Sequence, residues 1–414
     1  MTDCSTEVQA WLDDQAEEMA ALLDVLVRIP TENPPGRELG RCAGVLRDAM
    51  ERLGFSPEVI QLPPAGSLEE PAIVRGSVGS GGQLVYYHGH FDVVPAQSPE
   101  QFEPHRGDGK IVGRGTADMK GGLVSMLYGA AAARELGLLD GSKIVFHFVC
   151  DEETGSTAGS GHLREADLID PGAVAMLTAE PTGGVIWHAC RGAITLRVQT
   201  SGREAHVGFV HEGVNAFEHV IRIAEPLTAL SRELLDKRTS FPVERDEAAG
   251  SMLVVGGQAG AGAGFNVVPG SAWFSVDRRF NPEERLDQEL SRLTGMIEEA
   301  ARAAGAEVDI DVLQAQPSGS THQDHPAART LAGCIEAVEA AGATFQLCPG
   351  VLETRWYSQL GIPAFAYGGG RLDVSHGPRE YIDETAMRRC AAVYALFAAN
   401  SAASGAANAA SERD

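Results

Sequence analysis

The feature that most constrains the fold of this chain is a series of short, almost entirely apolar segments separated by helical patterns. Residues 84–87, 144–149 and 173–177 are apolar runs of this kind, and a helical stretch rich in small residues lies between the first two, at 122–136. Strands that are apolar on both sides are typical of parallel sheets covered by helices. The chain is therefore predicted to contain an α/β domain with a mostly parallel central sheet.

Helices are also expected before the first of these strands. Apolar residues at helical spacing predict a helix over 6–28, which residues 29–30 and the proline-rich cluster 33–36 would end. A second helix fits residues 38–53, closed by Gly54. The chain is thus expected to start with two helices joined by a proline-rich loop.

The pattern changes near residue 190, where segment 193–199 alternates apolar and polar residues as a half-exposed antiparallel strand does. A compact α+β unit is predicted from helices at 214–235 and 283–303, strands near 252–256 and 267–277, and an Ala/Gly-rich turn at 259–264. Strands at 344–347 and 364–367 then resume the first pattern, and residues 398–414 are expected to fray. We therefore predict one domain from residues 1–189 and 315–414, with residues 190–314 inserted into it as a second domain.

Composition narrows the class of partner and the compartment. The 414 residues carry a formal net charge of −24, which argues against nucleic acid or an anionic membrane as a partner. No apolar run approaches the roughly 18 residues of a membrane span, and residues 1–20 lack the apolar core of a signal peptide. The seven cysteines are scattered and never form a CxxC pair, which suits free thiols in a reducing compartment. A cytoplasmic protein is expected.

Ionisable side chains follow the apolar strands, at the sheet edge where an open α/β fold binds its ligands. His90 and Asp92 come after the first strand and are two residues apart, so in an extended segment both point the same way. Asp92 could therefore brace the imidazole of His90, as carboxylates brace metal-bound histidines. Taken alone, the pair is equally consistent with a structural histidine at a strand end.

Four further sites carry acids or a histidine. Asp118 lies on a glycine-flanked loop before a helix, where a carboxylate either caps the helix or binds a ligand, and the cap is the commoner role. The three adjacent acids 151–153 repel one another unless a cation or proton intervenes, although a solvated turn would tolerate them. Glu180 ends the third strand, and His376 follows the glycine turn 368–370.

Together these signals predict a metal centre. Two histidines and three carboxylates offer nitrogen and oxygen ligands without thiolate, a set that suits zinc, with cobalt or manganese as substitutes. Five protein ligands are too many for one catalytic zinc, which takes about three and keeps a position open. Two zinc ions account for all five ligands if they share one bridging carboxylate and each binds two further side chains.

Five segments carry a resemblance to a known family, in this order: GHFDVVPA, GRGTADMKGG, DEETGS, TAEPT and SHGPREYI. They resemble the metallopeptidase family of acetylornithine deacetylase, succinyl-diaminopimelate desuccinylase, aminoacylase and glutamate carboxypeptidase. The resemblance covers nearly the whole chain. It implies a zinc-exopeptidase-like catalytic domain and an inserted α+β lid, residues 190–314, that also forms a homodimer interface.

The resemblance also implies a role for each metal ligand and for the base. Asp118 would bridge two zinc ions, and each ion would have two further ligands: His90 and Glu180 for one, Glu153 and His376 for the other. Glu152 would be the general base, which takes a proton from the water between the metals and passes it to the leaving nitrogen. Asp92 would orient His90.

Further residues are matched to substrate. His206, in the segment GREAHVG, would donate to the oxyanion, from its own or the partner subunit. Asn266, Arg279 and Gly369 match substrate-contacting positions, although the neighbouring Arg278 competes with Arg279 for that role. Arg355 would bind the substrate carboxylate through both guanidinium arms, unless it forms a surface ion pair. Glu353 stands two residues before it, where the family more often has Asp.

The activity predicted from these features is hydrolysis of the amide bond of an N-acyl-L-amino acid. Glu at position 180 is typical of the deacylases and carboxypeptidases of the family, and Asp of its aminopeptidases and dipeptidases. A carboxypeptidase or dipeptidase is the alternative, since its substrate also presents an amide beside a carboxylate. A non-catalytic, metal-dependent binding protein is a third hypothesis, disfavoured because neither a ligand nor the base is missing.

Overall fold

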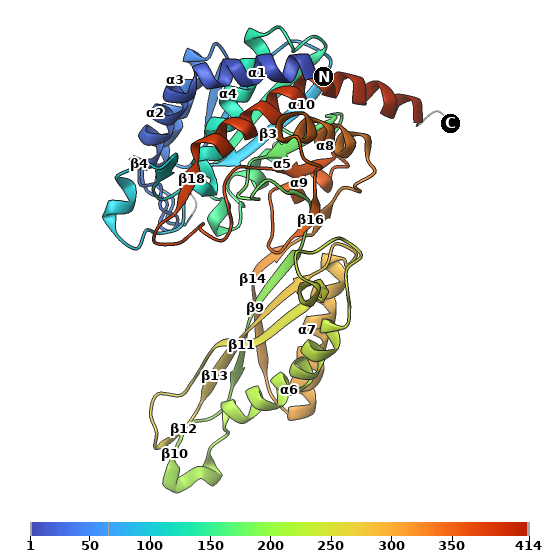
Figure 1. Cartoon of the computed structure of the whole chain (residues 1–414). Coiled ribbons are helices and arrows are strands. Elements are labelled where there is room, and N and C mark those ends of the chain that lie inside the picture. Colours follow the sequence, from blue (N-terminus) through green and yellow to red (C-terminus); the bar gives the residue numbers. More distant parts are fainter. Residues whose placement is uncertain (1, 65, 412–414) are drawn as a thin grey trace. The chain divides into compact units, whose positions relative to one another are not determined.

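A computed structural model of the chain describes residues 2–64 and 66–411, and it divides into two compact units (Figure 1). Unit 1 consists of Met1–His188, Ser320–Gln346 and Glu353–Asp414, and unit 2 of Ala189–Gly319 and Leu347–Leu352. The segment that we expected to be an inserted domain, 190–314, lies within unit 2. No helix in the described part of the chain has both the length and the apolar character to span a membrane.

The main sheet has parallel strands at its centre and antiparallel strands at its edges. Its order is β1-β2-β6-β3-β7-β17-β8-β15, with β16 beside β8, and the neighbours β6, β3, β7 and β17 are parallel. The strands are β1 Ser56–Gln61, β2 Ala72–Val78, β3 Gln83–His90, β6 Ser142–Val149, β7 Ala175–Thr178, β8 Ile186–Cys190, β15 Gly319–Ser320, β16 Phe345–Cys348 and β17 Ala364–Ala366. The predicted mostly parallel centre is confirmed, whereas the antiparallel pair β1–β2 was not predicted.

Helices cover this sheet in unit 1. They are α1 Thr2–Asp14, α2 Ala16–Val27, α3 Leu39–Arg52, α4 Gly121–Glu135, α5 Ser160–Glu165, α8 Pro326–Glu339, α9 Thr354–Ser358 and α10 Glu384–Ser411, with a short 3₁₀ turn at Pro99–Phe102. α4 packs on α10, and both contact β3. Gly129 allows the two helices to cross closely, because a Cβ there would lie 2.5 Å from the carbonyl oxygen of Ala391.

Three predictions about local structure were wrong. The helix expected over 6–28 is broken at Gln15, because residues 13–18 hold no large apolar side chain that could continue its buried face. Residues from 398 onward, expected to fray, continue α10 to Ser411, as their many alanines favour; residues 412–414 lie outside the described part. The turn expected at 259–264 starts later, since a strand runs to Ala261.

Unit 2 is an antiparallel sheet packed against two helices. The strand order is β11-β13-β9-β14, and a separate pair is formed by β10 and β12. The bounds are β9 Gly192–Ser201, β10 Ala205–His206, β11 Met252–Ala261, β12 Val267–Val268, β13 Ser271–Phe280, β14 Val308–Gln316, α6 Ala216–Leu235 and α7 Leu286–Ala304, with 3₁₀ turns at Val207–Glu212 and Asp246–Ala249. The alternation predicted for β9 is present, since Ile194, Leu196 and Val198 are buried in the core shared with α6 and α7.

Candidate metal centre

The five predicted metal ligands come from five separate places in unit 1. His90 ends β3, Glu180 follows β7, and Glu153 lies in the turn Glu152–Thr154 that follows β6. Asp118 lies in the turn Thr116–Lys120 before α4, and His376 lies on the loop between β17 and β18 (Tyr381–Asp383). Because β3, β6 and β7 are parallel, their carboxyl ends lie at one edge of the sheet.

The side chains of these residues meet around Asp118. Oδ1 of Asp118 lies 3.2 Å from Nε2 of His90, and Oδ2 lies 3.2 Å from Nε2 of His376. The same His376 nitrogen is 3.3 Å from Oε1 of Glu153. One carboxylate therefore faces two imidazoles, one through each oxygen.

Two overlapping groups of ligand atoms result from this arrangement. Donor atoms of His90, Asp118 and Glu180 all lie within 4.8 Å of one another, and so do those of Asp118, Glu153 and His376. Asp118 belongs to both groups, as a carboxylate that bridges two cations would. In addition, Oε1 of Glu180 is buried and receives no hydrogen bond from any described residue. A cation would satisfy this oxygen, so the residues fit a two-metal site.

The imidazole of His90 is held in an orientation in which Nε2 can bind a cation. Its Nδ1 lies 3.0 Å from the main-chain carbonyl oxygen of Asp92 and 3.3 Å from the carboxylate Oδ1 of the same residue. A proton on Nδ1 is donated to these acceptors, which leaves the lone pair of Nε2 free for a cation. The contact predicted between Asp92 and His90 is thus present, with the main-chain oxygen as the nearer acceptor.

Asp92 also holds the segment that carries Glu152 and Glu153. Its carboxylate accepts the backbone N–H of Glu152 at 3.2 Å and that of Glu153 at 3.1 Å. The side-chain amide of Asn33 donates to the same carboxylate at 2.9 Å and to the hydroxyl of Thr154 at 2.9 Å. Asn33 was not singled out from the sequence, where it is only one residue of a proline-rich loop.

The electrostatics of the cluster favour a bound cation. Burial and the neighbouring acids Asp118, Glu353 and Glu153 raise the pKa of Glu180 to about 8. Burial likewise raises the pKa of Glu152 well above its usual range. The hydrogen bonds to Asp118 and Glu153 raise the pKa of His376 to about 10. Without a cation, acids and histidines this close together hold extra protons, and metal ions would displace them.

Two alternative roles for the acids do not apply. The helix that follows Asp118 has Lys120 at its N-cap position with no side-chain cap, and the Asp118 carboxylate faces the two histidines. The acids 151–153 do not form a solvated turn either, because Asp151 is buried and accepts the backbone N–H groups of Ala158 at 2.7 Å and Gly159 at 2.8 Å.

Three predicted residues lie in unit 2. His206 is exposed on β10, and its Nδ1 accepts the backbone N–H of Gly208 at 3.1 Å, so a neutral ring carries its proton on Nε2. Asn266 is exposed on the loop before β12. Arg279 is half-exposed on β13 and forms a two-armed ion pair with Asp277, at 2.8 and 3.1 Å. The neighbouring Arg278 is fully buried between Glu284 and Glu289, so Arg279 is the one that solvent reaches.

Arg355 is buried rather than on the surface. Its Nη1 lies 3.1 Å from Oε1 of Glu353, and its guanidinium carbon lies 5.0 Å from the centre of the Trp356 ring. Glu353 is also fully buried and accepts the hydroxyls of Ser156 and Ser160. The surface ion pair considered as an alternative for Arg355 is therefore a buried one.

The three glycines 368–370 allow their turn to approach the backbone of neighbouring segments closely. A Cβ on Gly368 would lie 2.2 Å from the carbonyl oxygen of Glu180, and one on Gly370 would lie 2.3 Å from that of Ala117. A Cβ on Gly369 would lie 2.7 Å from the carbonyl oxygen of Ala386 in α10. The turn thus packs against the segments that carry two of the ligands, and substrate contact by Gly369 stays a prediction.

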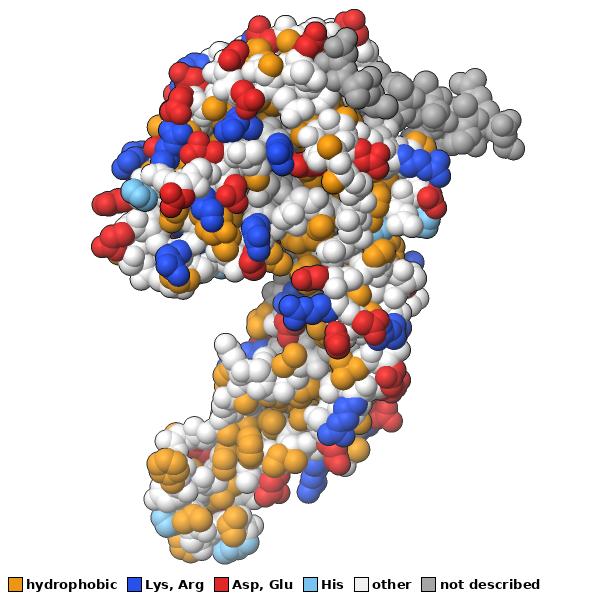
Figure 2. Space-filling model, in the orientation of Figure 1, with side chains coloured by type: hydrophobic (Ala, Val, Ile, Leu, Met, Phe, Trp, Pro, Cys, Tyr) orange, Lys and Arg blue, Asp and Glu red, His pale blue; other side chains and the backbone are white. Residues whose placement is uncertain are grey.

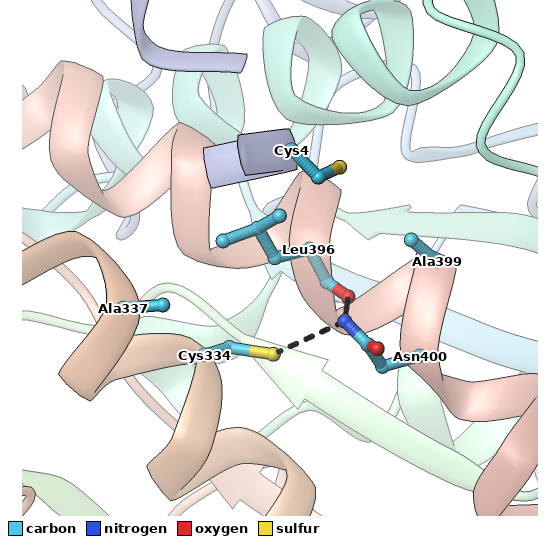
Figure 3. A pocket seen from close by; sticks show the side chains of 6 residues that line it. All are labelled: Cys4, Cys334, Ala337, Leu396, Ala399 and Asn400. Atoms are coloured by element: carbon cyan, nitrogen blue, oxygen red, sulfur yellow. Dashed lines mark hydrogen bonds between the residues drawn. The ribbon is translucent and has the colours of Figure 1, made fainter. Parts of the chain in front are cut away.

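A separate small cavity lies between α1, α8 and α10 (Figure 3). Its volume is about 130 Å³, and its described lining residues are Cys4, Cys334, Ala337, Leu396, Ala399 and Asn400. The Asn400 amide donates to the carbonyl oxygen of Leu396 at 2.7 Å and lies 4.0 Å from the Cys334 sulfur (Figure 3). None of these described lining residues is an acid or a histidine, so the cavity lacks the chemistry of the Asp118 cluster.

Comparison with known proteins shows the family to which the chain belongs. The model of peptidase family M20/M25/M40 matches residues 86–400. A succinyl-diaminopimelate desuccinylase of Methylorubrum extorquens is 30% identical over 318 residues, which cover 72% of this chain and 77% of that protein. An acetylornithine deacetylase of Myxococcus xanthus is 28% identical over 363 residues, 85% of this chain and 89% of that protein. The metallo-carboxypeptidase Sso-CP2 of Sulfolobus solfataricus has the same fold, with a TM-score of 0.77 at 15% identity over 93% of this chain and 99% of that one. The chain therefore belongs to peptidase family M20/M25/M40, a family of hydrolases that includes deacylases and desuccinylases.

Proposed function

We propose that this protein is an N-acyl-L-amino-acid amidohydrolase that uses two divalent cations, zinc foremost. The observation that carries the proposal is the Asp118 carboxylate, whose two oxygens each lie 3.2 Å from a different histidine. Support for the substrate class comes from the relatives, whose names are those of a desuccinylase and a deacetylase. Both of those reactions cleave an amide that joins an acyl group to an amino acid.

The chemistry of such a site divides between cations and side chains. Two cations held by Asp118, His90, Glu180, Glu153 and His376 would polarise the amide carbonyl and lower the pKa of a bound water from its value in bulk to about 7. The protein holds the ligands in place before any substrate arrives, through the contacts of Asp92 with His90 and with the 152–153 backbone.

Glu152 is the proposed carrier of the proton. It is half-buried, next to the ligand cluster, and its carboxylate lies within 4.8 Å of donor atoms of His90 and Glu153. Burial raises its pKa well above the usual range, which suits a group that first accepts a proton from water and then gives it to the leaving nitrogen. Each such transfer contributes roughly 10²–10⁴-fold to a rate.

The residues proposed to bind substrate divide between the two units. Arg355 is the proposed partner of the substrate carboxylate on the strength of the family resemblance; in the structure it is buried, and its Nη1 pairs with Glu353. His206 would donate from Nε2 to the oxygen on which negative charge develops, consistent with its Nδ1 being occupied as an acceptor. Asn266, Arg279 and Gly369 are the remaining proposed contacts.

Unit 2 is the proposed lid and homodimer interface. Around β10 and its neighbours it exposes large apolar side chains, namely Val207, Phe209, Val210, Phe217, Ile221 and Phe265, with fractions exposed of 43% or more. Figure 2 shows hydrophobic side chains gathered with histidines at the end of unit 2 that carries β10 and β12. Clusters of exposed apolar side chains mark protein interfaces, and a second copy of this chain is the occupant that we propose. Within the described residues no disulfide joins any of the seven cysteines, which supports the proposed cytoplasmic location.

The test is an activity screen of the zinc-loaded protein. N-acetyl and N-succinyl amino acids should be hydrolysed, in preference to N-blocked and free dipeptides, and excess chelator should abolish turnover. Faster hydrolysis of dipeptides would instead assign a dipeptidase or carboxypeptidase. Less than one metal ion per chain, together with no hydrolysis of any substrate, would refute the amidohydrolase.

A further inference from the structure

Two buried charged residues, Arg114 and Glu380, lie outside the ligand cluster but contact the backbone of segments that carry its ligands. One carboxylate oxygen of Glu380 accepts the backbone N–H groups of Ala117 and Asp118, both at 3.0 Å. The other accepts Nη1 of Arg114 at 2.6 Å. Arg114 and Glu380 are each 1% exposed, so this ion pair is shielded from water.

The same pair reaches the loop that carries His376. Nη2 of Arg114 lies 3.4 Å from the carbonyl oxygen of His376. The side-chain amide of Gln101 donates to the carbonyl oxygen of Gly377 at 3.0 Å, and the main-chain carbonyl oxygen of Gln101 accepts the backbone N–H of Arg114 at 2.8 Å. His376 has a φ of 60°, a left-handed conformation that only surrounding contacts can maintain in a residue with a side chain.

From these contacts we infer that Arg114 and Glu380 are positioning residues, which set the separation of Asp118 and His376. Glu380 holds the backbone of Asp118, Arg114 holds the backbone of His376, and the ion pair joins the two. The inference rests on the proposed function, because it assigns the pair to the cation site that Asp118, Glu153 and His376 would form. Neither residue is among the candidate ligands, so the pair would act through the direction in which ligands point.

A purely structural role would also explain a buried ion pair, so the test needs a matched control. Unit 2 offers one in Arg278 and Glu284, which are buried and paired at 2.5 Å. Glu380→Gln and Glu284→Gln each remove one charge from a buried pair. Both should lower the melting temperature, but only Glu380→Gln should weaken zinc binding, by about 10–100-fold.

Two further variants keep the inference testable if Glu380→Gln does not fold. The double variant Arg114→Met/Glu380→Leu replaces the whole pair by apolar side chains, a change that buried ion pairs often tolerate. Glu380→Ala opens a space beside an existing cavity of about 200 Å³, which Gln101, Gly113, Pro378 and Glu380 help to line. Formate is small enough to enter there and to replace the missing carboxylate.

The measurement is zinc affinity by competition with a chromophoric chelator, without substrate, beside thermal unfolding. We expect both ions to bind the wild type, one of them to bind about 10–100-fold more weakly in the double variant and in Glu380→Ala, and formate to restore much of the loss in Glu380→Ala. Unchanged affinities, or equal losses in Glu380→Gln and Glu284→Gln, would overturn the positioning role while leaving the proposed function in place. A wild type that binds no pair of zinc ions would overturn both.

Discussion

Nε2 of His88 lies 3.1 Å from Oε2 of Glu353, and both side chains are completely buried. The other ring nitrogen of His88 lies 3.0 Å from the hydroxyl of Tyr357, which is also 2.8 Å from Nδ1 of His147. On the opposite side, Glu353 meets Arg355. A continuous buried polar chain therefore connects the sheet to the proposed carboxylate-binding arginine.

Replacing Glu353 should destabilise the fold. Glu353→Gln leaves the buried guanidinium of Arg355 without its counter-charge, and breaking such a pair costs about 3–5 kcal/mol in the free energy of unfolding. Glu353→Asp keeps the charge and should cost less. Urea unfolding measures both, and equal stability of Glu353→Gln and wild type would contradict the assigned role.

The same carboxylate predicts a dependence of stability on pH. Burial alone would raise the pKa of Glu353, but Arg355 and His88 bring it down to about 2, from an ordinary value of 4.5. The native state thus holds fewer protons on Glu353 than the unfolded state, so the stabilisation is complete above pH 4.5 and is lost as the pH falls toward 2. Over that interval the unfolding free energy of Glu353→Gln should fall less steeply than that of wild type.

Glu152→Gln should abolish most activity while folding and metal content stay the same. The amide cannot take a proton from water, so kcat should fall by about 10²–10⁴-fold. Glu165→Gln, at an exposed glutamate that ends α5, is the control and should be fully active. Substantial turnover by Glu152→Gln would exclude this residue as the base.

Asp92→Asn should weaken both metal binding and catalysis. An amide in place of the carboxylate presents a donor where the structure has acceptors for the N–H groups of Glu152 and Glu153 and for Asn33. Loss of such supporting contacts to metal ligands costs about 10–100-fold in affinity or activity. The metal affinity, measured by titration, and kcat should therefore fall together. If neither changes, Asp92 does not support the metal ligands.

His206→Ala should lower kcat by about 10²–10³-fold without affecting metal content. A mixture with Glu152→Gln then distinguishes the two arrangements that the sequence left open. If His206 acts across the dimer, mixed dimers contain one site with both residues intact, and activity reappears on mixing. If His206 acts in its own subunit, every site lacks one residue and the mixture stays inactive.

Zinc binding should release protons at neutral pH. In the metal-free protein, burial is the main cause that raises the pKa of Glu180 to about 8. The hydrogen bonds to Asp118 and Glu153 raise the pKa of His376 to about 10. Both groups are therefore largely protonated at pH 7 and must lose the proton to bind a cation, so zinc affinity should rise with pH. Calorimetry in buffers of different ionisation enthalpy counts the protons, and an affinity independent of pH would contradict this description.

The sequence by itself determined the parallel centre of the sheet and the set of residues that meet at its edge. Apolar strands can only be buried on both faces, and the carboxyl ends of parallel strands share one edge. The acids and histidines that follow those strands, such as His90 and Glu180, were therefore predictable as a group. The resemblance to the family added which of the acids 151–153 binds metal.

Only the tertiary structure decided which side chains support that group. Arg114 and Glu380 are 266 residues apart, and His88 and Glu353 are 265 apart, so no local spacing indicates that they touch. Nor could the sequence separate Arg278, buried between two glutamates, from the half-exposed Arg279, because adjacent strand residues point to opposite faces and the covered face depends on packing. The spacing of apolar residues that predicts a helix or a strand is a local property of the sequence. The partner of a buried charge depends instead on how distant segments pack.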